Sequence, residues 1–176
     1  MFILGIIIFF IILIILAQYN TLIRLRNRVK QSKSGIEVYL NQRFDLIPNL
    51  VECVKGYSKH EKDILENITN LRTLYNENKD FDKANKLNSG INTILAIAEN
   101  YPDLKASEQY LNLQRNLVKI ESQLQAARRI YNNDVTKYNI KLETVPTNII
   151  ANLFNFKPAE LFQIEEFKKE NINIEL

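Results

Sequence analysis

The sequence is poor in the residues on which many folds and active sites depend. Its 176 residues include one cysteine, one histidine, four glycines and four prolines. The single cysteine, Cys53, excludes an intramolecular disulfide and fits a reducing compartment. So few glycines and prolines supply too little turn chemistry for a many-stranded sheet or barrel. The composition therefore favours a helical protein.

The shortage of histidine limits the available chemistry. His60-Glu61 begins the H-E-x-x-H pattern of zinc proteases, but Ile64 stands where the second histidine ligand is needed. A Ser or Cys triad would need the same His60 to relay its proton. Cys53 has no base near it in the sequence and is interpreted as a small apolar residue. A phosphate loop cannot be built either, because the glycines are widely separated at Gly5, Gly35, Gly56 and Gly90.

We therefore expect no enzymatic activity, no cofactor, no metal site and no small-molecule substrate. A Lys-dependent or metal-assisted hydrolase is the alternative in the enzyme class. A chelator-sensitive activity that depends on His60 would support that alternative.

Charge is absent from the first seventeen residues, which are almost entirely Ile, Leu and Phe. A helix over residues 1–23 rises about 35 Å, enough to cross the roughly 30 Å hydrocarbon core of a bilayer. We predict a single-pass anchor in the cell membrane, with membrane lipid as its partner. A cleaved signal peptide is the alternative, but no cation precedes the run, and a bulky Ile15 stands where a cleavage site needs a small residue.

Five cations follow the apolar run, and together they exceed the net charge of +3. Under the positive-inside bias they place the N-terminus outside and the bulk of the chain in the cytoplasm. We expect them to contact lipid headgroups. Because the remaining chain is slightly acidic, no nucleic-acid partner is expected. The cations are Arg24, Arg26, Arg28, Lys30 and Lys33.

Apolar residues recur at intervals of three and four through the rest of the chain, as one face of a helix requires. The first helix is predicted to run from the membrane to about Asn41. Asp45 is a candidate cap for a second helix that has Pro48 in its first turn. That helix has a possible break at Gly56, beside a capping-box pattern at Ser58-Lys59-His60-Glu61.

Two further helices complete the predicted body. Asp80 or Asp82 can cap the third helix, which Pro102 is expected to end. The fourth begins at Asp103 or Ser107 and continues for thirty or more residues. The predicted fold is thus all-α: an antiparallel up-and-down four-helix bundle behind an N-terminal transmembrane helix.

The predicted domain division is an anchor over 1–23, a cytoplasmic bundle over 24–162 and a loosely ordered tail over 163–176. Apolar residues crowd between Ile149 and Phe162. They predict a hydrophobic lid folded back on the bundle end. A second membrane-contacting patch is the alternative.

Two sets of polar residues are candidates for a site. Tyr131-Asn132 and Tyr138-Asn139 stand seven apart on one helix face, and we expect them to form a polar ladder to the first helix through Asn27 or Tyr19-Asn20. The second set either fixes helix register or marks a partner surface, and a partner surface requires it to be exposed. Its members are Arg43, Asp45, Glu52, His60, Glu61 and Arg128.

Several of these segments closely resemble the bacterial LemA family, from the anchor to about Phe162. The resemblance implies a helical bundle, usually with an N-terminal membrane anchor and a cytoplasmic body, and it implies no established reaction or cofactor. Lys137 and Thr144-Val145 depart from the family pattern and affect only local packing. The matching segments are Tyr19-Asn20, Arg26-Asn27-x-Val29, Arg43-x-Asp45-Leu46-Ile47-Pro48-Asn49-Leu50-Val51, Val54-Lys55-Gly56-Tyr57, His60-Glu61, Tyr101-Pro102-Asp103-Leu104-Lys105-Ala106, Ala127-Arg128-x-x-Tyr131-Asn132 and Tyr138-Asn139.

The leading functional hypothesis is a membrane-anchored helical scaffold that binds an unidentified protein partner. The alternative is a lipid-contacting protein that remodels or senses membranes. In that case the basic segment Arg24 to Lys33 and the apolar segment Ile149 to Phe162 both touch lipid.

Overall fold

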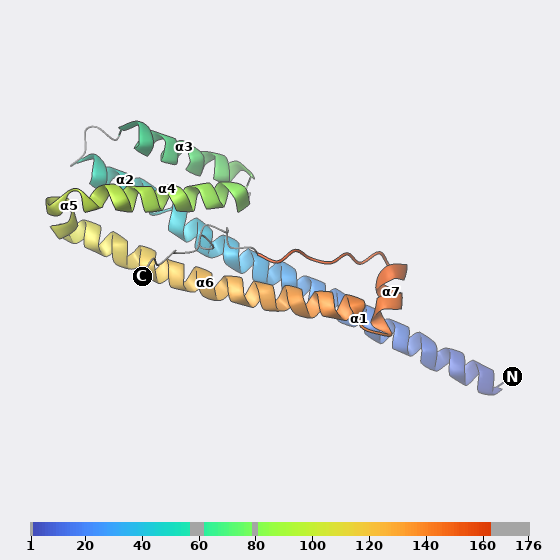
Figure 1. Ribbon diagram of the computed structural model, residues 1–176. Helices are drawn as coiled ribbons and strands as arrows, with labels where there is room; N and C mark the ends of the chain where they lie inside the picture. Colours follow the sequence, from blue (N-terminus) through green and yellow to red (C-terminus); the bar gives the residue numbers. More distant parts are fainter. Residues whose placement is uncertain (1, 57–61, 79–80, 163–176) are drawn as a thin grey trace, which may run out of the picture. The chain divides into compact units, whose positions relative to one another are not determined.

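The computed structural model describes residues 2–56, 62–78 and 81–162, and every regular element in these ranges is an α-helix (Figure 1). The all-α class is thereby confirmed, while the four-helix bundle order stays a prediction. The helices are α1 Phe2–Phe44, α2 Ile47–Lys55, α3 Lys62–Asn78, α4 Phe81–Glu99, α5 Pro102–Ala106, α6 Glu108–Glu143 and α7 Thr147–Leu153.

The chain forms two compact units. Unit 1 comprises Met1–Lys33 and Arg128–Leu176, and unit 2 comprises Ser34–Ala127. The two long helices, α1 and α6, each contribute residues to both units. The division at residues 23 and 162 stays a prediction, and the tail 163–176 lies outside the described residues.

Helix α1 is longer than the sequence predicted. It continues past Asn41 to Phe44, and Gly35 lies inside it without interrupting it. Between Phe2 and Ala17 no side chain is buried. Among the described residues, α1 is the one helix long and apolar enough to cross a membrane. The exposed apolar run fits a membrane anchor.

The core of unit 2 is made by short helices that pack on one another. Helix α4 contacts α2, α3 and α5, and α2 also contacts α3. Gly90 of α4 permits close approach to α3, because a Cβ built there would lie 3.0 Å from Cγ1 of Ile68. The largest buried apolar side chains include Phe44, Leu50, Leu65, Tyr75, Leu87, Ile91, Ile94 and Leu104.

The predicted helix boundaries are mostly confirmed. Helix α2 has Pro48 in its first turn and ends at Lys55, so the break at Gly56 is present. Ser107 Oγ accepts a 3.3 Å hydrogen bond from the Tyr110 N–H and so caps α6. Pro102 begins the short helix α5, after α4 has ended at Glu99.

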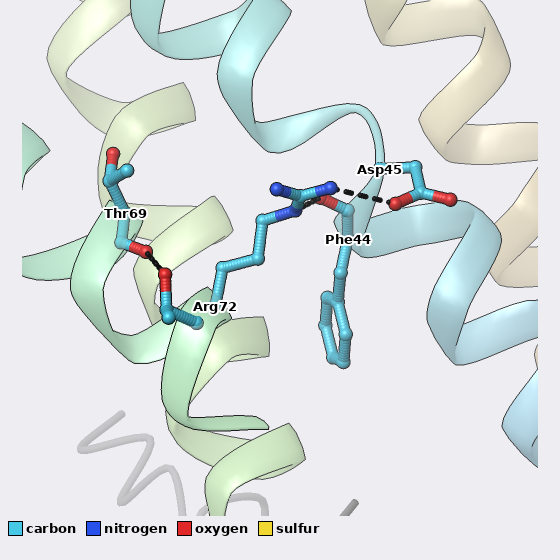
Figure 2. A network of polar contacts seen from close by, with 5 residues as sticks. Phe44, Asp45, Thr69 and Arg72 are labelled. Carbon is cyan, nitrogen blue, oxygen red and sulfur yellow. Dashed lines mark hydrogen bonds and ion pairs between the residues drawn. The ribbon is translucent and has the colours of Figure 1, made fainter. Parts of the chain in front are cut away.

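One predicted cap is wrong. Asp45 does not cap α2, whose N-cap residue is Leu46 and makes no side-chain capping bond. Instead, Asp45 Oδ1 accepts a 2.9 Å bond from Arg72, which also donates from Nε to the Phe44 carbonyl at 3.1 Å (Figure 2). The arginine of α3 therefore satisfies the carbonyl group at the end of α1. The capping box at residues 58–61, like Asp80, lies outside the described residues.

In unit 1, α1 and α6 lie side by side (Figure 1), with Arg28 Nε 3.6 Å from the buried carboxylate of Asp134. Helix α7 buries Thr147, Ile150 and Ala151. Between α7 and residue 162, where the described part of the chain ends, there is no regular secondary structure, and we refer to residues 156–162 as the strap. The predicted lid is thus a short helix followed by a strap that lies against the two long helices of unit 1.

Candidate functional site

The main polar feature of unit 1 is a ladder of side chains on α6 that pair with the backbone of the strap. Asn139 donates from Nδ2 to the Ala159 carbonyl at 2.8 Å, and its Oδ1 accepts from the Ala159 N–H at 2.9 Å. Asn132 makes the same pair of bonds with Phe162, at 3.1 and 2.8 Å. Each asparagine thereby satisfies both backbone groups of one strap residue.

The spacing of the two asparagines matches the geometry of the strap. Seven residues of α-helix rise about 10.5 Å, and three residues of extended chain span about 10 Å. Asn132 and Asn139 are seven apart on α6, and their partners Phe162 and Ala159 are three apart on the strap. Two asparagines spaced seven residues apart on a helix can therefore bind an extended segment through the main chain of that segment alone.

Two tyrosines reinforce the ladder. The Tyr131 hydroxyl donates to the Glu160 carbonyl at 2.9 Å, and the Tyr138 hydroxyl donates to the Lys157 carbonyl at 3.0 Å. Burial raises the pKa of both phenols; nearby Glu160 raises that of Tyr131 further, whereas Arg26 opposes the shift at Tyr138. The Tyr-Asn pairs were expected to bond the first helix, and this expectation is wrong: their partners are strap backbone groups.

The strap and α7 are also held by α1. The ring of Tyr19 lies 4.8 Å from that of Phe154 and 5.8 Å from that of Phe156, between ring centroids. The Thr147 hydroxyl donates to Gln18 Oε1 at 3.2 Å. A groove of about 350 Å³ lies along this junction, lined by Arg26, Val29, Lys30, Tyr138, Asn155, Phe156, Lys157 and Ala159.

The cations predicted to contact lipid headgroups lie on α1 within unit 1. Arg26 and Arg28 contact other side chains of unit 1. The Arg26 guanidinium lies 5.3 Å from the centroid of the Phe156 ring, and Arg28 forms the ion pair with Asp134 while its side chain remains largely exposed. Arg24, Lys30 and Lys33 also have exposed side chains. Headgroup contact by these five residues stays a prediction.

Arg43 does not belong to an exposed partner surface, because it is buried in unit 2. Its guanidinium forms an ion pair with Glu121 of α6, whose other carboxylate oxygen accepts a 2.7 Å bond from Gln125. Burial lowers the pKa of Arg43, and Glu121 opposes that shift. The ion pair links α1 to α6 within unit 2, and a register-fixing role for Arg43 stays a prediction.

The other described members of the predicted polar set are divided between the two units. Asp45 is exposed and pairs with Arg72, Glu52 is exposed on α2, and His60 and Glu61 lie outside the described residues. Arg128 belongs to unit 1, where its guanidinium lies 4.8 Å from the centroid of the Phe162 ring at the end of the strap.

Sequence reasoning missed Arg72, Glu121 and the pairing of the strap backbone with side chains of α6. No local pattern marks Glu121 as the partner of a residue 78 positions away. The two Tyr-Asn pairs, seven residues apart, were the sequence pattern that indicated a bound segment, because two asparagines on a half-buried helix face need hydrogen-bond partners. It did not reveal that those partners were main-chain groups.

Groups that could carry chemistry are sparse in the part of the chain that the structure describes. It contains no cluster of three or more His, Cys, Asp or Glu side chains able to hold a metal ion. Burial and the neighbouring Glu52 both raise the pKa of the Cys53 thiol, which disfavours the reactive thiolate.

Comparison with known proteins gives one family and two kinds of relative. The model of the LemA family matches residues 32–176. The chain is 30% identical to Protein LemA of Metamycoplasma hominis over 178 residues, which covers 98% of this chain and 80% of that protein.

Magnetosome proteins form the second kind of relative. The chain is 23% identical to Magnetosome protein MamQ 2 of Paramagnetospirillum magneticum, over 85% of this chain and 66% of that protein. It is 21% identical to Magnetosome protein MamQ of Magnetospirillum gryphiswaldense, over 84% and 65%. The chain spans about two thirds of the length of these MamQ proteins.

Proposed function

The chain belongs to the LemA family, and we propose that it is a membrane-anchored, non-enzymatic scaffold whose helical body binds a protein partner on the cytoplasmic side of the cell membrane. The observation that carries the proposal is the continuity of α1. One helix begins with an exposed apolar run and ends among the buried side chains Ile36, Leu40 and Phe44 of unit 2. The apolar run that is suited to lipid and the part of α1 that packs in unit 2 thus belong to one uninterrupted helix.

The polar residues left exposed in unit 2 are the natural place for a partner. Asp45 and Glu52 both project to solvent. A partner that recognises them is expected to present cationic side chains. Crosslinking tests this directly: photoreactive residues at Asp45 and Glu52 in the intact membrane protein should capture the same protein above background in living cells.

Matched positions on the apolar run serve as the control. Photoreactive residues at Ile8 and Ile12, which are exposed on α1, should capture lipid and not that protein. A body that captures no protein at either polar position, in cells where the chain is membrane-bound, contradicts the scaffold role.

The orientation is tested by labelling. In a Cys53→Ser background, a cysteine at exposed Glu52 should resist a membrane-impermeant maleimide in intact cells and react after permeabilisation. Reaction without permeabilisation contradicts a cytoplasmic body.

A second function is supported by the row of cations after the apolar run. Arg24, Arg26 and Arg28 are exposed on the first turns beyond the predicted span. A lipid-sensing or membrane-remodelling protein would use them to select anionic lipid. Reconstituted chain should then deform or cluster anionic vesicles, and added salt should weaken the effect. Equal behaviour in neutral and anionic vesicles contradicts this function.

A further inference from the structure

Helix α7 and the turn before it expose an unusual amount of apolar surface for a segment that is otherwise well packed. The exposed fractions are 71% for Val145, 66% for Ile149, 73% for Leu153 and 49% for Phe154. Ile149 and Leu153 are one helical turn apart and share a face. The opposite face, with Ile150 and Ala151, is buried. Helix α7 therefore carries apolar side chains on both faces, and no described residue covers the face of Ile149 and Leu153.

This segment is fixed at the point where the apolar run of α1 ends. Thr147 bonds Gln18, and the rings of Phe154 and Phe156 pack on Tyr19. Gln18 and Tyr19 directly follow Ala17, the last residue of the apolar run. A tyrosine at that place is typical of a membrane–water interface. In Figure 1, α7 runs across the direction of α1, as a helix lying along a membrane surface would beside a spanning helix.

The exposed face is held firmly. Helix α7 ends in a Schellman motif, in which Asn155 has a φ of 54° and the Phe156 N–H donates to the Ala151 carbonyl at 2.9 Å. Beyond this motif, the strap is bound through the Asn139 and Asn132 ladder. The apolar side chains Ile149 and Leu153 of α7 are therefore held in an exposed position, although contact with water is unfavourable for them.

Two cations, Arg26 and Lys157, lie beyond α7 on the side away from the apolar run of α1. Lys157 and Arg26 line the groove beside Phe156, and Arg26 follows Tyr19 by seven residues, about 10 Å along the helix. Apolar side chains at the end of the span, with cations about 10 Å further on, match the order of acyl chains and anionic headgroups in a leaflet.

We propose that residues 145–154 form an interfacial foot. Ile149 and Leu153 insert into the leaflet from which α1 emerges, and the strap holds them at that depth. The occupant of the exposed face is lipid, because α7 is fixed to Gln18 and Tyr19, directly after the apolar run of α1 that lipid must also cover. The inference rests on the proposed function only in requiring that α1 spans the membrane.

Reporters on the full chain test the foot. In a Cys53→Ser background, single cysteines replace Ile11, Ile149, Leu153 or Val118, and each carries an environment-sensitive fluorophore in proteoliposomes. Val118 is the matched control, since it is an exposed apolar residue of unit 2. Quenching is measured with nitroxide lipids labelled near the headgroup or near the chain centre.

We expect Ile149 and Leu153 to be quenched at least about twofold more than Val118, and more strongly by the shallow nitroxide than by the deep one. Ile11 should be quenched most by the deep nitroxide. If Ile11 is quenched while Ile149 and Leu153 behave like Val118, the foot is refuted and the anchor stands. If Ile11 is not quenched, the anchor itself fails. If fluorophores at positions 149 and 153 are shielded from both lipid and aqueous quenchers, protein covers this face of α7, and the proposal is also overturned.

Discussion

At the scale of single residues, Asn139 offers the clearest test of the strap. Replacing it with Ala removes two hydrogen bonds to Ala159, each contributing about 1 kcal/mol. Amide exchange over residues 157–162 should accelerate, and unit 1 should lose about 2 kcal/mol of stability. Hydrogen exchange read by mass spectrometry measures the first effect.

Two variants sharpen this test. Asn139→Asp keeps the acceptor for the Ala159 N–H but sets a carboxylate oxygen against the Ala159 carbonyl, so at neutral pH its effect should be at least as large as that of Asn139→Ala. Asn152→Ala is the control, because Asn152 is exposed on α7 and its side chain makes none of the hydrogen bonds of the ladder. Unchanged exchange in Asn139→Ala would show that the ladder does not hold the strap.

Tyr75 and Tyr138 should respond in opposite directions to loss of the hydroxyl. The Tyr75 hydroxyl is buried and has no hydrogen-bond partner among the described residues, whereas that of Tyr138 donates to Lys157. Tyr75→Phe is expected to stabilise the protein by up to about 1 kcal/mol, and Tyr138→Phe to destabilise it by about 1 kcal/mol. Urea midpoints at constant m-value measure both changes. A loss of stability in Tyr75→Phe contradicts the first expectation.

The Arg43–Glu121 pair should be asymmetric. Arg43 is nearly buried, while a third of the Glu121 side chain is exposed. Glu121→Ala leaves a buried guanidinium without its counter-charge and should cost about 3 kcal/mol. Arg43→Met should cost about 1 kcal/mol, because Glu121 reaches water and keeps its bond from Gln125. If a denaturant titration shows the same loss of stability in both variants, the burial of Arg43 does not cause the asymmetry.

At the scale of helices, the same change at two glycines should have opposite effects. Gly35→Ala adds a Cβ with nothing within 4 Å inside α1, so the gain in helix propensity should stabilise it by about 1 kcal/mol. Gly90→Ala places its Cβ 3.0 Å from the buried, β-branched Ile68 and should destabilise by about 1 kcal/mol or more. Thermal unfolding followed by circular dichroism compares them.

A second substitution isolates the steric cause. In an Ile68→Ala background, Gly90→Ala should become neutral or stabilising, because the obstructing side chain is gone. If Gly90→Ala remains as damaging there, the close approach of α3 and α4 is not the reason for the glycine.

The helices could be predicted from the sequence because their signals are local. The period of apolar residues located α2, α4 and α6, and Ser107 was identifiable as a cap from its type and position. The pairing of the strap with α6 could not be predicted, because the strap has no sequence period and is bound through its backbone groups, which every residue shares. Asp45 was misassigned since a cap and an ion pair use the same carboxylate, and only the fold brings Arg72 to it.

At the scale of the whole molecule, the two long helices link the sequence pattern to the function. Helix α1 joins an apolar run to the buried residues of unit 2, and α6 contributes the strap ladder to unit 1 and Glu121 to unit 2. The prediction of a membrane anchor follows from composition alone. The foot does not, because the apolar residues between Ile149 and Phe162 fit a lid equally well until their burial is known.

High pH should weaken both units, because buried tyrosines occur in each. Burial raises the pKa of Tyr75 and Tyr110 in unit 2 and of Tyr131 and Tyr138 in unit 1. Below the unfolded pKa of about 10 these phenols are protonated in both states, and their contribution to stability is complete. As the pH rises from about 10 through the raised folded values, the unfolded chain ionises first and stability falls.

Urea unfolding of the detergent-solubilised chain at about pH 8 and about pH 11 measures this loss. The matched variant carries Tyr75→Phe, Tyr131→Phe and Tyr138→Phe, and its stability should fall less between the two pH values, whatever its starting stability. Lysines also deprotonate in this range, but they are the same in both proteins, so the difference in slope belongs to the phenols. An identical fall in the two chains would mean that the buried tyrosines ionise as readily in the folded protein as in the unfolded one.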